Sequence, residues 1–263
     1  MSLIRPALQY LSHRMRTANS KGHGVHSPFF FDFIQHVLPD TGPLPEFEKP
    51  ERYRRELLGD DTIFSRIDLG SGSRKPMQSV AIRSIAQRAL QPPRRARLLY
   101  RILKHYSPGV VLELGTCFGV TTEYLAMAQP TQPVYTLEGD PFIAQKARAR
   151  FQQDGFTHIE SIIGNFDEVL SDVLRKIGSI GFVWLDGNHR KEPTLRYLDQ
   201  LLPYLSEESI LVFDDIYWSK GMQEAWRSIQ QHPRVGATID LFWFGIVLLR
   251  REFREPVHLR LHY

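Results

Sequence analysis

The sequence has 263 residues, of which 42% are apolar and 24% are charged, a balance typical of a folded globular protein and not of a disordered one. Its longest uninterrupted apolar stretch, residues 241–249, is much shorter than the roughly 20 residues that a membrane span needs, so we expect no membrane partner. The single cysteine, Cys117, excludes an intramolecular disulfide and favours a reducing, cytoplasmic location.

The net charge of +4 is distributed unevenly along the chain. Residues 1–109 carry 18 Lys and Arg against 9 Asp and Glu, a net charge of +9, whereas residues 110–263 carry 15 against 20, a net charge of −5. A basic protein invites a nucleic-acid interpretation, but here the excess belongs to one half of the chain. The sequence predicts a basic, mainly helical N-terminal extension or cap over residues 1–93 and a second domain over residues 94–263.

The N-terminal elements follow in chain order. Apolar residues at positions 4, 8, 11 and 15 predict an amphipathic helix, and a loop over residues 22–28 follows it. Within that loop, His23 and His26 either reach a functional site or serve the loop structure. The aromatic run Phe29–Phe33 predicts the start of a short helix, and an amphipathic helix after Pro93 is predicted to stop at residues 107–109.

From residue 110 onward, short β-rich runs alternate with helical patterns. Helical stretches separate the first five runs, which predicts parallel βαβ units, and the last two are joined so tightly that they should be antiparallel neighbours. The fold class is therefore α/β, with a doubly wound, seven-stranded, mostly parallel sheet whose last strand is antiparallel. The predicted strands are Val110–Leu114, Val134–Glu138, Ile159–Ile163, Gly181–Asp186, Ser209–Asp214, Ala237–Trp243 and Gly245–Arg250.

A glycine-containing turn follows the first of these strands. Gly115 and Gly119 let the backbone approach a ligand closely, and a helix begins at Thr121, where free N–H groups favour a negative ligand group. The next strand ends in Glu138, whose carboxylate suits the two hydroxyls of a ribose. The turn is Gly-x-x-x-Gly and lacks the pattern that brings backbone against a pyrophosphate. An adenosyl ligand without phosphates is the better fit.

These motifs resemble those of class I S-adenosylmethionine-dependent methyltransferases, which have a Rossmann-like fold. The resemblance covers about residues 95–250 and implies that S-adenosylmethionine is the cofactor. A similar glycine pattern at Gly70 and Gly72 has no acid at a suitable distance and is interpreted as a turn near the substrate. The residues that the resemblance assigns to the cofactor are Glu113, Gly115, Thr116, Gly119, Thr121, Glu138, Asn165, Phe166 and Asp186.

Acidic residues also end the fourth and fifth strands, as Asp186 and the pair Asp214-Asp215. Parallel strands open their carboxyl ends at one edge of the sheet, where three carboxylates together favour Mg²⁺ or another divalent cation. The alternative is that Asp214 or Asp215 caps the following helix.

The pattern is similar to that of metal-dependent O-methyltransferases of the catechol and caffeoyl-CoA type, although those have Asp-Asn where this chain has Asp-Asp. The resemblance implies that Asp186 takes part in catalysis, and that His189 occupies the position of the family's general-base lysine. An imidazole with a pKa near 6.5 accepts a hydroxyl proton at neutral pH, so a base role is retained. The alternative is a histidine hydrogen-bonded within its own loop.

Taken together, the sequence predicts an S-adenosylmethionine-dependent methyltransferase that methylates a hydroxyl of a small molecule with the help of a divalent metal. Two alternatives stay open: an RNA (tRNA or rRNA) methyltransferase that uses the basic N-terminal half, and a non-catalytic S-adenosylmethionine-binding protein. The missing Asn/Asp-Pro-Pro-Tyr/Phe signature and the scattered basic residues count against RNA. A homodimer is a further expectation.

Overall fold

The structure is a computed structural model that describes residues 10, 13, 17, 27–40, 42–67, 78–253 and 255–263. The chain forms two compact units, Met1–Pro39 with Gly178–Tyr263 and Asp40–Ile177. The domain boundary predicted at residue 93 is not one of these limits and stays a prediction. Three predicted features lie outside the described residues: the amphipathic helix with residues 4, 8, 11 and 15, the loop with His23 and His26, and the turn with Gly70 and Gly72.

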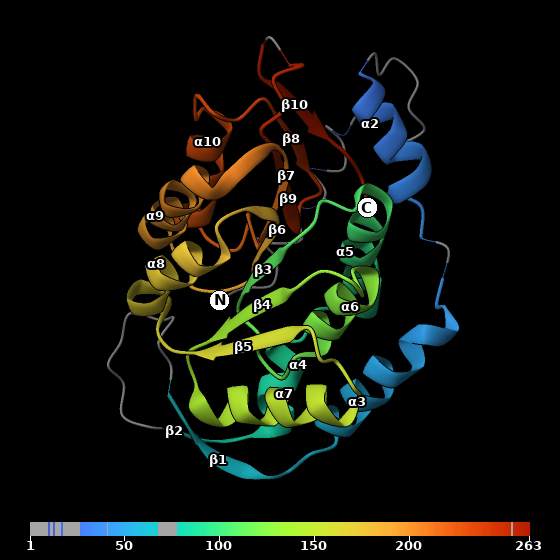
Figure 1. Ribbon diagram of the computed structural model, residues 1–263, viewed down its shortest axis with the longest axis vertical. Coiled ribbons are helices and arrows are strands. Elements are labelled where there is room, and N and C mark those ends of the chain that lie inside the picture. Colours follow the sequence, from blue (N-terminus) through green and yellow to red (C-terminus); the bar gives the residue numbers. More distant parts are fainter. Residues whose placement is uncertain are drawn as a thin grey trace. The chain divides into compact units, whose positions relative to one another are not determined.

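The unit Asp40–Ile177 contains a three-stranded parallel sheet in the order β3-β4-β5 (Figure 1). Helices α6 and α7 connect these strands, which is the βαβ arrangement that the sequence predicts. Its elements in chain order are η2 (Pro45–Phe47), α3 (Glu48–Leu58), β1 (Ile63–Arg66), β2 (Gln78–Ala81), α4 (Ile82–Ala89), α5 (Pro93–Tyr106), β3 (Val111–Leu114), α6 (Val120–Ala128), β4 (Val134–Glu138), α7 (Pro141–Gln153), β5 (Ile159–Ile163) and α8 (Phe166–Ile177).

Local sequence explains where the helices of this unit begin and end. Pro93 starts α5, and Ser107 ends it in the left-handed conformation with φ of 44°, as predicted for this stop signal. Asp140 caps α7, accepting hydrogen bonds from the backbone N–H groups of Phe142 and Ile143 at 2.9 and 3.0 Å, with Pro141 in the first turn.

The hairpin of β1 and β2 is a strand pair that the sequence did not predict. The two strands are antiparallel, with Ile63 opposite Ala81 and Arg66 opposite Gln78. Each has only four residues, too few to stand out as an alternating pattern. Tertiary packing stabilises the hairpin, because the buried ring of Phe64 stacks on Phe142 of α7 with centroids 4.3 Å apart.

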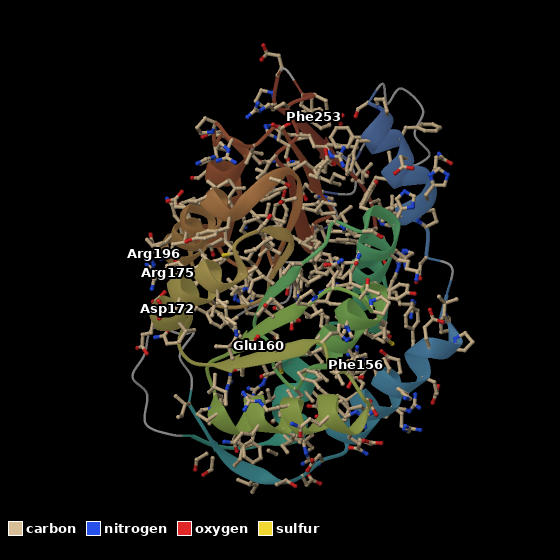
Figure 2. The ribbon with its side chains drawn as sticks, viewed as in Figure 1. Phe156, Glu160, Asp172, Arg175, Arg196 and Phe253 are labelled. Carbon is tan, nitrogen blue, oxygen red and sulfur yellow. The ribbon has the colours of Figure 1, made fainter. Side chains whose placement is uncertain are left out.

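The outer surface of this unit carries ion pairs. Glu160 of β5 pairs with Lys176 of α8, and Asp172 pairs with Arg175 along the same helix (Figure 2). Exposed pairs of this kind contribute little to stability, so the buried apolar residues between strands and helices hold the unit together.

The unit built from Gly178–Tyr263 and the N-terminal residues contains five strands in the order β10-β8-β9-β7-β6 (Figure 1). Strands β6 and β7 are parallel, and β9 is antiparallel to both β7 and β8. This confirms that the last of the seven predicted strands, β9, is antiparallel to its neighbours. The elements are α2 (Pro28–Asp32), η1 (Phe33–Val37), β6 (Ile180–Leu185), α9 (Lys191–Leu201), η3 (Leu202–Tyr204), β7 (Leu205–Asp214), α10 (Lys220–Gln230), β8 (Ala237–Asp240), β9 (Phe244–Leu248) and β10 (Val257–Arg260).

Apart from the β1–β2 hairpin, the predicted seven-stranded sheet needs a correction to eight strands among the described residues, β3 to β5 in one unit and β6 to β10 in the other. The additional strand is β10, Val257–Arg260, which pairs in parallel with β8. It was missed because it is short and largely exposed, so its sequence shows no run of buried β-branched residues. All seven predicted strands are present, and the α/β class with a mostly parallel sheet is confirmed.

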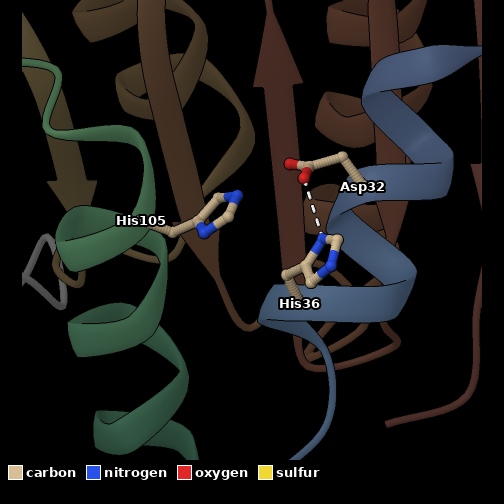
Figure 3. A group of neighbouring side chains, drawn as sticks. All are labelled: Asp32, His36 and His105. Atoms are coloured by element: carbon tan, nitrogen blue, oxygen red, sulfur yellow. Dashed lines mark hydrogen bonds and ion pairs between the residues drawn. The ribbon is translucent and has the colours of Figure 1, made fainter.

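The aromatic run near the N-terminus forms the predicted short helix, α2, and packs within this unit. Phe30 lies against Phe253 with ring centroids 5.4 Å apart, and the guanidinium of Arg250 lies 4.8 Å from the ring centroid of Phe29. A hydrogen bond of 2.9 Å between Asp32 and His36 joins α2 to the π-helical turn η1 (Figure 3). None of the helices in the described ranges has the length and apolar character needed to cross a membrane.

Candidate active site

The glycine turn of the unit Asp40–Ile177 lies between β3 and α6. Gly115 and Gly119 have φ of 111° and 86°, in the region that favours glycine, and Gly119 is the N-cap of α6. A Cβ atom at Gly119 would lie 2.5 Å from Cε1 of Phe151, so both the backbone angle and the available space require glycine here. The turn therefore holds its backbone N–H groups in a fixed arrangement at the start of a helix.

Glu138 ends β4 beside this turn, as its spacing predicts. One carboxylate oxygen accepts a hydrogen bond from the backbone N–H of Cys117 at 2.9 Å, and the other accepts from the N–H of Asp140 at 2.9 Å. Burial raises the pKa of Glu138, while these two N–H groups oppose the rise. A carboxylate offers about four acceptor sites, so each oxygen keeps capacity to accept from a ligand hydroxyl.

The predicted residues Glu113 and Thr116 are buried under the turn. Glu113 is fully buried and accepts hydrogen bonds from the hydroxyls of Thr122 and Thr136, at 2.5 and 2.6 Å. Because the Thr136 hydroxyl donates to Glu113, it accepts from Thr116, 2.5 Å away. This network holds the turn against strand β4, so Glu113 and Thr116 support the backbone of the turn from within the core. Thr121, in the first turn of α6, is also buried.

Asn165 and Phe166 lie at the end of β5 and the start of α8. The side-chain oxygen of Asn165 accepts a hydrogen bond from the N–H of Asp167 at 3.1 Å, which leaves its NH₂ group as the side-chain donor. Gly164 donates its N–H to the backbone oxygen of Glu138 at 2.9 Å and so holds this segment beside the end of β4. The placement is compatible with the predicted adenine contacts, which stay a prediction.

The other unit brings together Asp186, His189 and Asp214. Asp186 follows β6, Asp214 ends the parallel neighbour β7, and one ligand atom from each of the three side chains lies within 4.8 Å of the others. Nε2 of His189 is 3.6 Å from Oδ1 of Asp186. The parallel register of β6 and β7 places these acids at one edge of the sheet, as predicted.

Asp215 has φ of 52° and is not part of this cluster of side chains. The alternative role of Asp214 or Asp215 as cap of α10 is taken by Ser219, whose hydroxyl accepts from the N–H of Met222 at 3.1 Å. The assignment of Asp215 to a metal thus stays a prediction without support from this geometry.

The loop that carries His189 has a fixed backbone. Asn188 has φ of 53°, donates from its side-chain nitrogen to the hydroxyl of Tyr197 at 3.0 Å, and accepts from Nε of Arg190 at 2.8 Å. A non-glycine residue in this conformation is held there by its surroundings. The loop therefore presents His189 in a defined position next to Asp186.

Sequence reasoning missed a buried network around Asp240, the last residue of β8. Its carboxylate accepts from the hydroxyl of Tyr217 at 2.7 Å and the N–H of Phe242 at 2.9 Å, and lies 2.9 Å from Nε2 of His13. Burial alone would raise the pKa of Asp240, but these three partners hold it below the usual value. The available signal is an acid at the end of a strand, but the predicted strand Ala237–Trp243 extends three residues beyond Asp240, where β8 ends.

The donor set of Asp186, Asp214 and His189 has the composition of a divalent-metal site. Carboxylate oxygens suit Mg²⁺ and Mn²⁺, and an imidazole extends the choice to Zn²⁺ and Fe²⁺. The three side chains thus fit such an ion as ligands. If His189 were a ligand through Nε2, that atom could not act as the general base at the same time, so the two roles compete.

Comparison with known proteins identifies the class of this chain. Residues 112–216 match the family model described as a methyltransferase domain. The chain carries a methyltransferase domain. The match begins in β3 and ends just after the acidic pair, so it includes the glycine turn, Glu138 and the Asp186 cluster. The methyltransferase assignment made from the motifs is confirmed. No curated protein sequence matches the chain.

Solved structures share the fold of the methyltransferase chain. Cofactor-bound Rv0187 from MTB is 18% identical with a TM-score of 0.57, over 89% of this chain and 99% of that one. An O-methyltransferase from Bacillus cereus in complex with SAH is 16% identical with a TM-score of 0.55, over 82% and 96%. The O-methyltransferase TomG from Streptomyces achromogenes, in complex with SAM, is 17% identical with a TM-score of 0.54, over 62% and 82%. At these identities the likeness establishes the fold.

Proposed function

We propose that this methyltransferase transfers the methyl group of S-adenosylmethionine to a hydroxyl oxygen of a small molecule. The observation that carries the proposal is Glu138, whose two carboxylate oxygens are oriented by the N–H groups of Cys117 and Asp140 beside the Gly115–Gly119 turn. An oriented acceptor pair of this kind suits a ribose diol, and the turn lacks the glycine pattern for a pyrophosphate. The SAM and SAH complexes among the structural neighbours agree with this ligand.

S-adenosylmethionine supplies a methyl group that its sulfonium already activates, so the protein has to bind, orient and remove one proton. His189 is the proposed proton acceptor. Oδ1 of Asp186 lies 3.6 Å from Nε2 of His189, so this carboxylate is placed to orient the imidazole as it accepts a hydroxyl proton. In this proposal Asp186 orients His189, the general base, and also contacts the cofactor.

A divalent ion held by Asp186 and Asp214 would lower the pKa of a hydroxyl bound to it. His189 then either completes the ligand set or accepts the proton. Turnover in excess chelator, followed by addition of Mg²⁺, Mn²⁺ or Zn²⁺, distinguishes the two versions. Full turnover in chelator would remove the metal from the proposal and leave His189 as the base.

The experiment that tests the cofactor site is calorimetric titration of S-adenosylhomocysteine into Glu138→Gln. The loss of a charged acceptor to two hydroxyls predicts an affinity at least about tenfold lower than that of the wild type. Glu160→Gln is the matched control, because Glu160 lies on the adjacent strand β5 and pairs on the surface with Lys176. Equal affinity of the Glu138 variant and the wild type would contradict the proposal.

The remaining parts of the proposal concern partners and location. The neighbour TomG, an O-methyltransferase involved in tomaymycin synthesis, supports a small-molecule acceptor, and no observation on the described residues favours RNA. The homodimer and the cytoplasmic location stay predictions, the latter supported by the single cysteine. Sedimentation of the full chain checks the first of these.

A further inference from the structure

We infer that Arg66, at the end of β1, is a second protein contact to the nucleoside of the methyl donor, placed opposite Glu138 on the ribose. This inference rests on the proposed function, because it needs the ribose to be held by Glu138. It adds a residue from the N-terminal hairpin to a cofactor site that the motifs place wholly in the later part of the chain. Three independent features of the unit Asp40–Ile177 carry it.

The first feature is the position of the hairpin. The backbone N–H of Ile67 donates to Oδ2 of Asp140 at 2.7 Å, and the N–H of Asp140 donates to Glu138 at 2.9 Å. Two further contacts attach β1 and the residues before it to helix α7. Phe64 stacks on Phe142, and Nζ of Lys146 lies 3.3 Å from the carboxylate of Asp60. The end of β1 is therefore tied directly to the segment that carries the ribose acceptor.

The second feature is a buried atom, Nε, of the partly buried Arg66 side chain. Alternate residues of a strand point to the same face, so Arg66 shares a face with Phe64, which packs against α7. Its Nε is buried and has no hydrogen-bond partner among the described residues. A buried guanidinium nitrogen without a partner is costly, and a ligand acceptor at this place would remove the cost.

The third feature is the charge relation to Glu138. Burial raises the pKa of this carboxyl, Asp140 raises it further, and the positive charge of Arg66 acts in the opposite direction, together with the N–H groups of Asp140 and Cys117. The positive charge of Arg66 thus favours the ionised carboxylate. Ribose hydroxyls both donate and accept, so a carboxylate acceptor and a guanidinium donor together are complementary to them.

The test is calorimetric titration of S-adenosylhomocysteine into five variants of the full chain. Arg66→Gln is expected to weaken binding by about tenfold or more, and Arg66→Lys to recover part of the loss because it keeps the charge but not the forked donors. Arg83→Gln is the matched control, since Arg83 pairs with Asp61 next to the same hairpin and is exposed. Thermal melts establish whether each variant is folded.

The double variant Arg66→Gln/Glu138→Gln separates a shared ligand group from a general effect. If both side chains hold the same ribose, the loss in the double variant is smaller than the product of the two single losses. Wild-type affinity of Arg66→Gln with a clear loss in Glu138→Gln overturns this inference and leaves the proposed function intact. Wild-type affinity of both single variants overturns the proposed cofactor site as well. An equal loss in Arg83→Gln assigns the effect to hairpin stability and also overturns the inference.

Discussion

Replacing Gly119 by alanine adds a single methyl group to the turn between β3 and α6 and tests why this turn requires glycine. Gly119 has φ of 86°, and an added Cβ would lie 2.5 and 2.6 Å from Cε1 and Cζ of Phe151 and 3.2 Å from Cβ of Ala147. Phe151 is almost fully buried in α7, so its ring has little room to move. The substitution therefore combines backbone strain with steric overlap.

The two contributions can be estimated separately. A non-glycine residue in the left-handed region costs about 1–2 kcal/mol. An extra methyl group in a filled interior typically costs about 1–3 kcal/mol. Gly119→Ala is therefore expected to lower the free energy of unfolding by about 2–5 kcal/mol, and to weaken binding of S-adenosylhomocysteine because the N–H groups at the start of α6 move.

Gly155→Ala provides the matched control. Gly155 also has positive φ, at 79°, but nothing lies within 4 Å of an added Cβ. It should therefore lose only the strain contribution of about 1–2 kcal/mol and keep wild-type cofactor affinity. Urea unfolding of the wild type and both variants, followed by circular dichroism and extrapolated linearly to water, measures the difference.

The difference between the two variants isolates the contact with Phe151. A third variant, Gly119→Ala/Phe151→Leu, removes the ring that obstructs the methyl group and should recover part of the lost binding. Equal losses of stability in Gly119→Ala and Gly155→Ala, with unchanged affinity for S-adenosylhomocysteine, would refute the reasoning. The glycine would then serve the backbone angle alone.

Three further predictions concern the other charged groups. His189→Gln should lower kcat by about 10²–10⁴-fold with unchanged affinity for S-adenosylhomocysteine, and a small change in kcat would remove the histidine from proton transfer. Asp240→Asn should lower the free energy of unfolding by about 3–5 kcal/mol, measured in urea, because it breaks a buried charged network with His13; a loss below 1 kcal/mol would contradict this. Burial raises the pKa of Glu123 to about 7, so the native state keeps its proton longer than the unfolded chain does and stability falls as the pH rises from about 4.5 to 7. Glu123→Gln should reduce that fall by about 3 kcal/mol in urea titrations at pH 5 and pH 8, and an unchanged pH dependence would show that Arg150 keeps the carboxylate ionised.

The sequence alone determined where the main strands lie along the chain and which residues end them. Strands β4 and β5 occupy the predicted ranges, and Glu138 and Asp214 end their strands as expected. Local signals suffice here because apolar runs of β-branched residues, separated by amphipathic helices, have few alternative arrangements. The end of α5 at Ser107 was predictable from the stop signal at residues 107–109. The antiparallel direction of β9 was predictable from its short connection to the strand before it.

Only the tertiary structure decided what several of these residues do. Glu113 stands in the motif like a ligand contact, yet one oxygen of its buried carboxylate accepts hydrogen bonds from the hydroxyls of Thr122 and Thr136. Asp214 clusters with Asp186 and His189, whereas its neighbour Asp215 does not. The physical reason is that the direction of a side chain depends on the backbone angle at that residue and on partners far along the chain. Neither is encoded in local spacing.

The hairpin of β1 and β2 shows most clearly the difference between what local sequence predicts and what long-range packing decides. Four residues per strand give too weak a local pattern to predict, and the pair is stabilised by packing of Phe64 on Phe142 and by the bond from Ile67 to Asp140. These partners are more than 70 residues apart in sequence. Length, charge and motifs therefore determined a methyltransferase with an acidic C-terminal half. Long-range packing decided that a segment of the basic half lies beside Glu138.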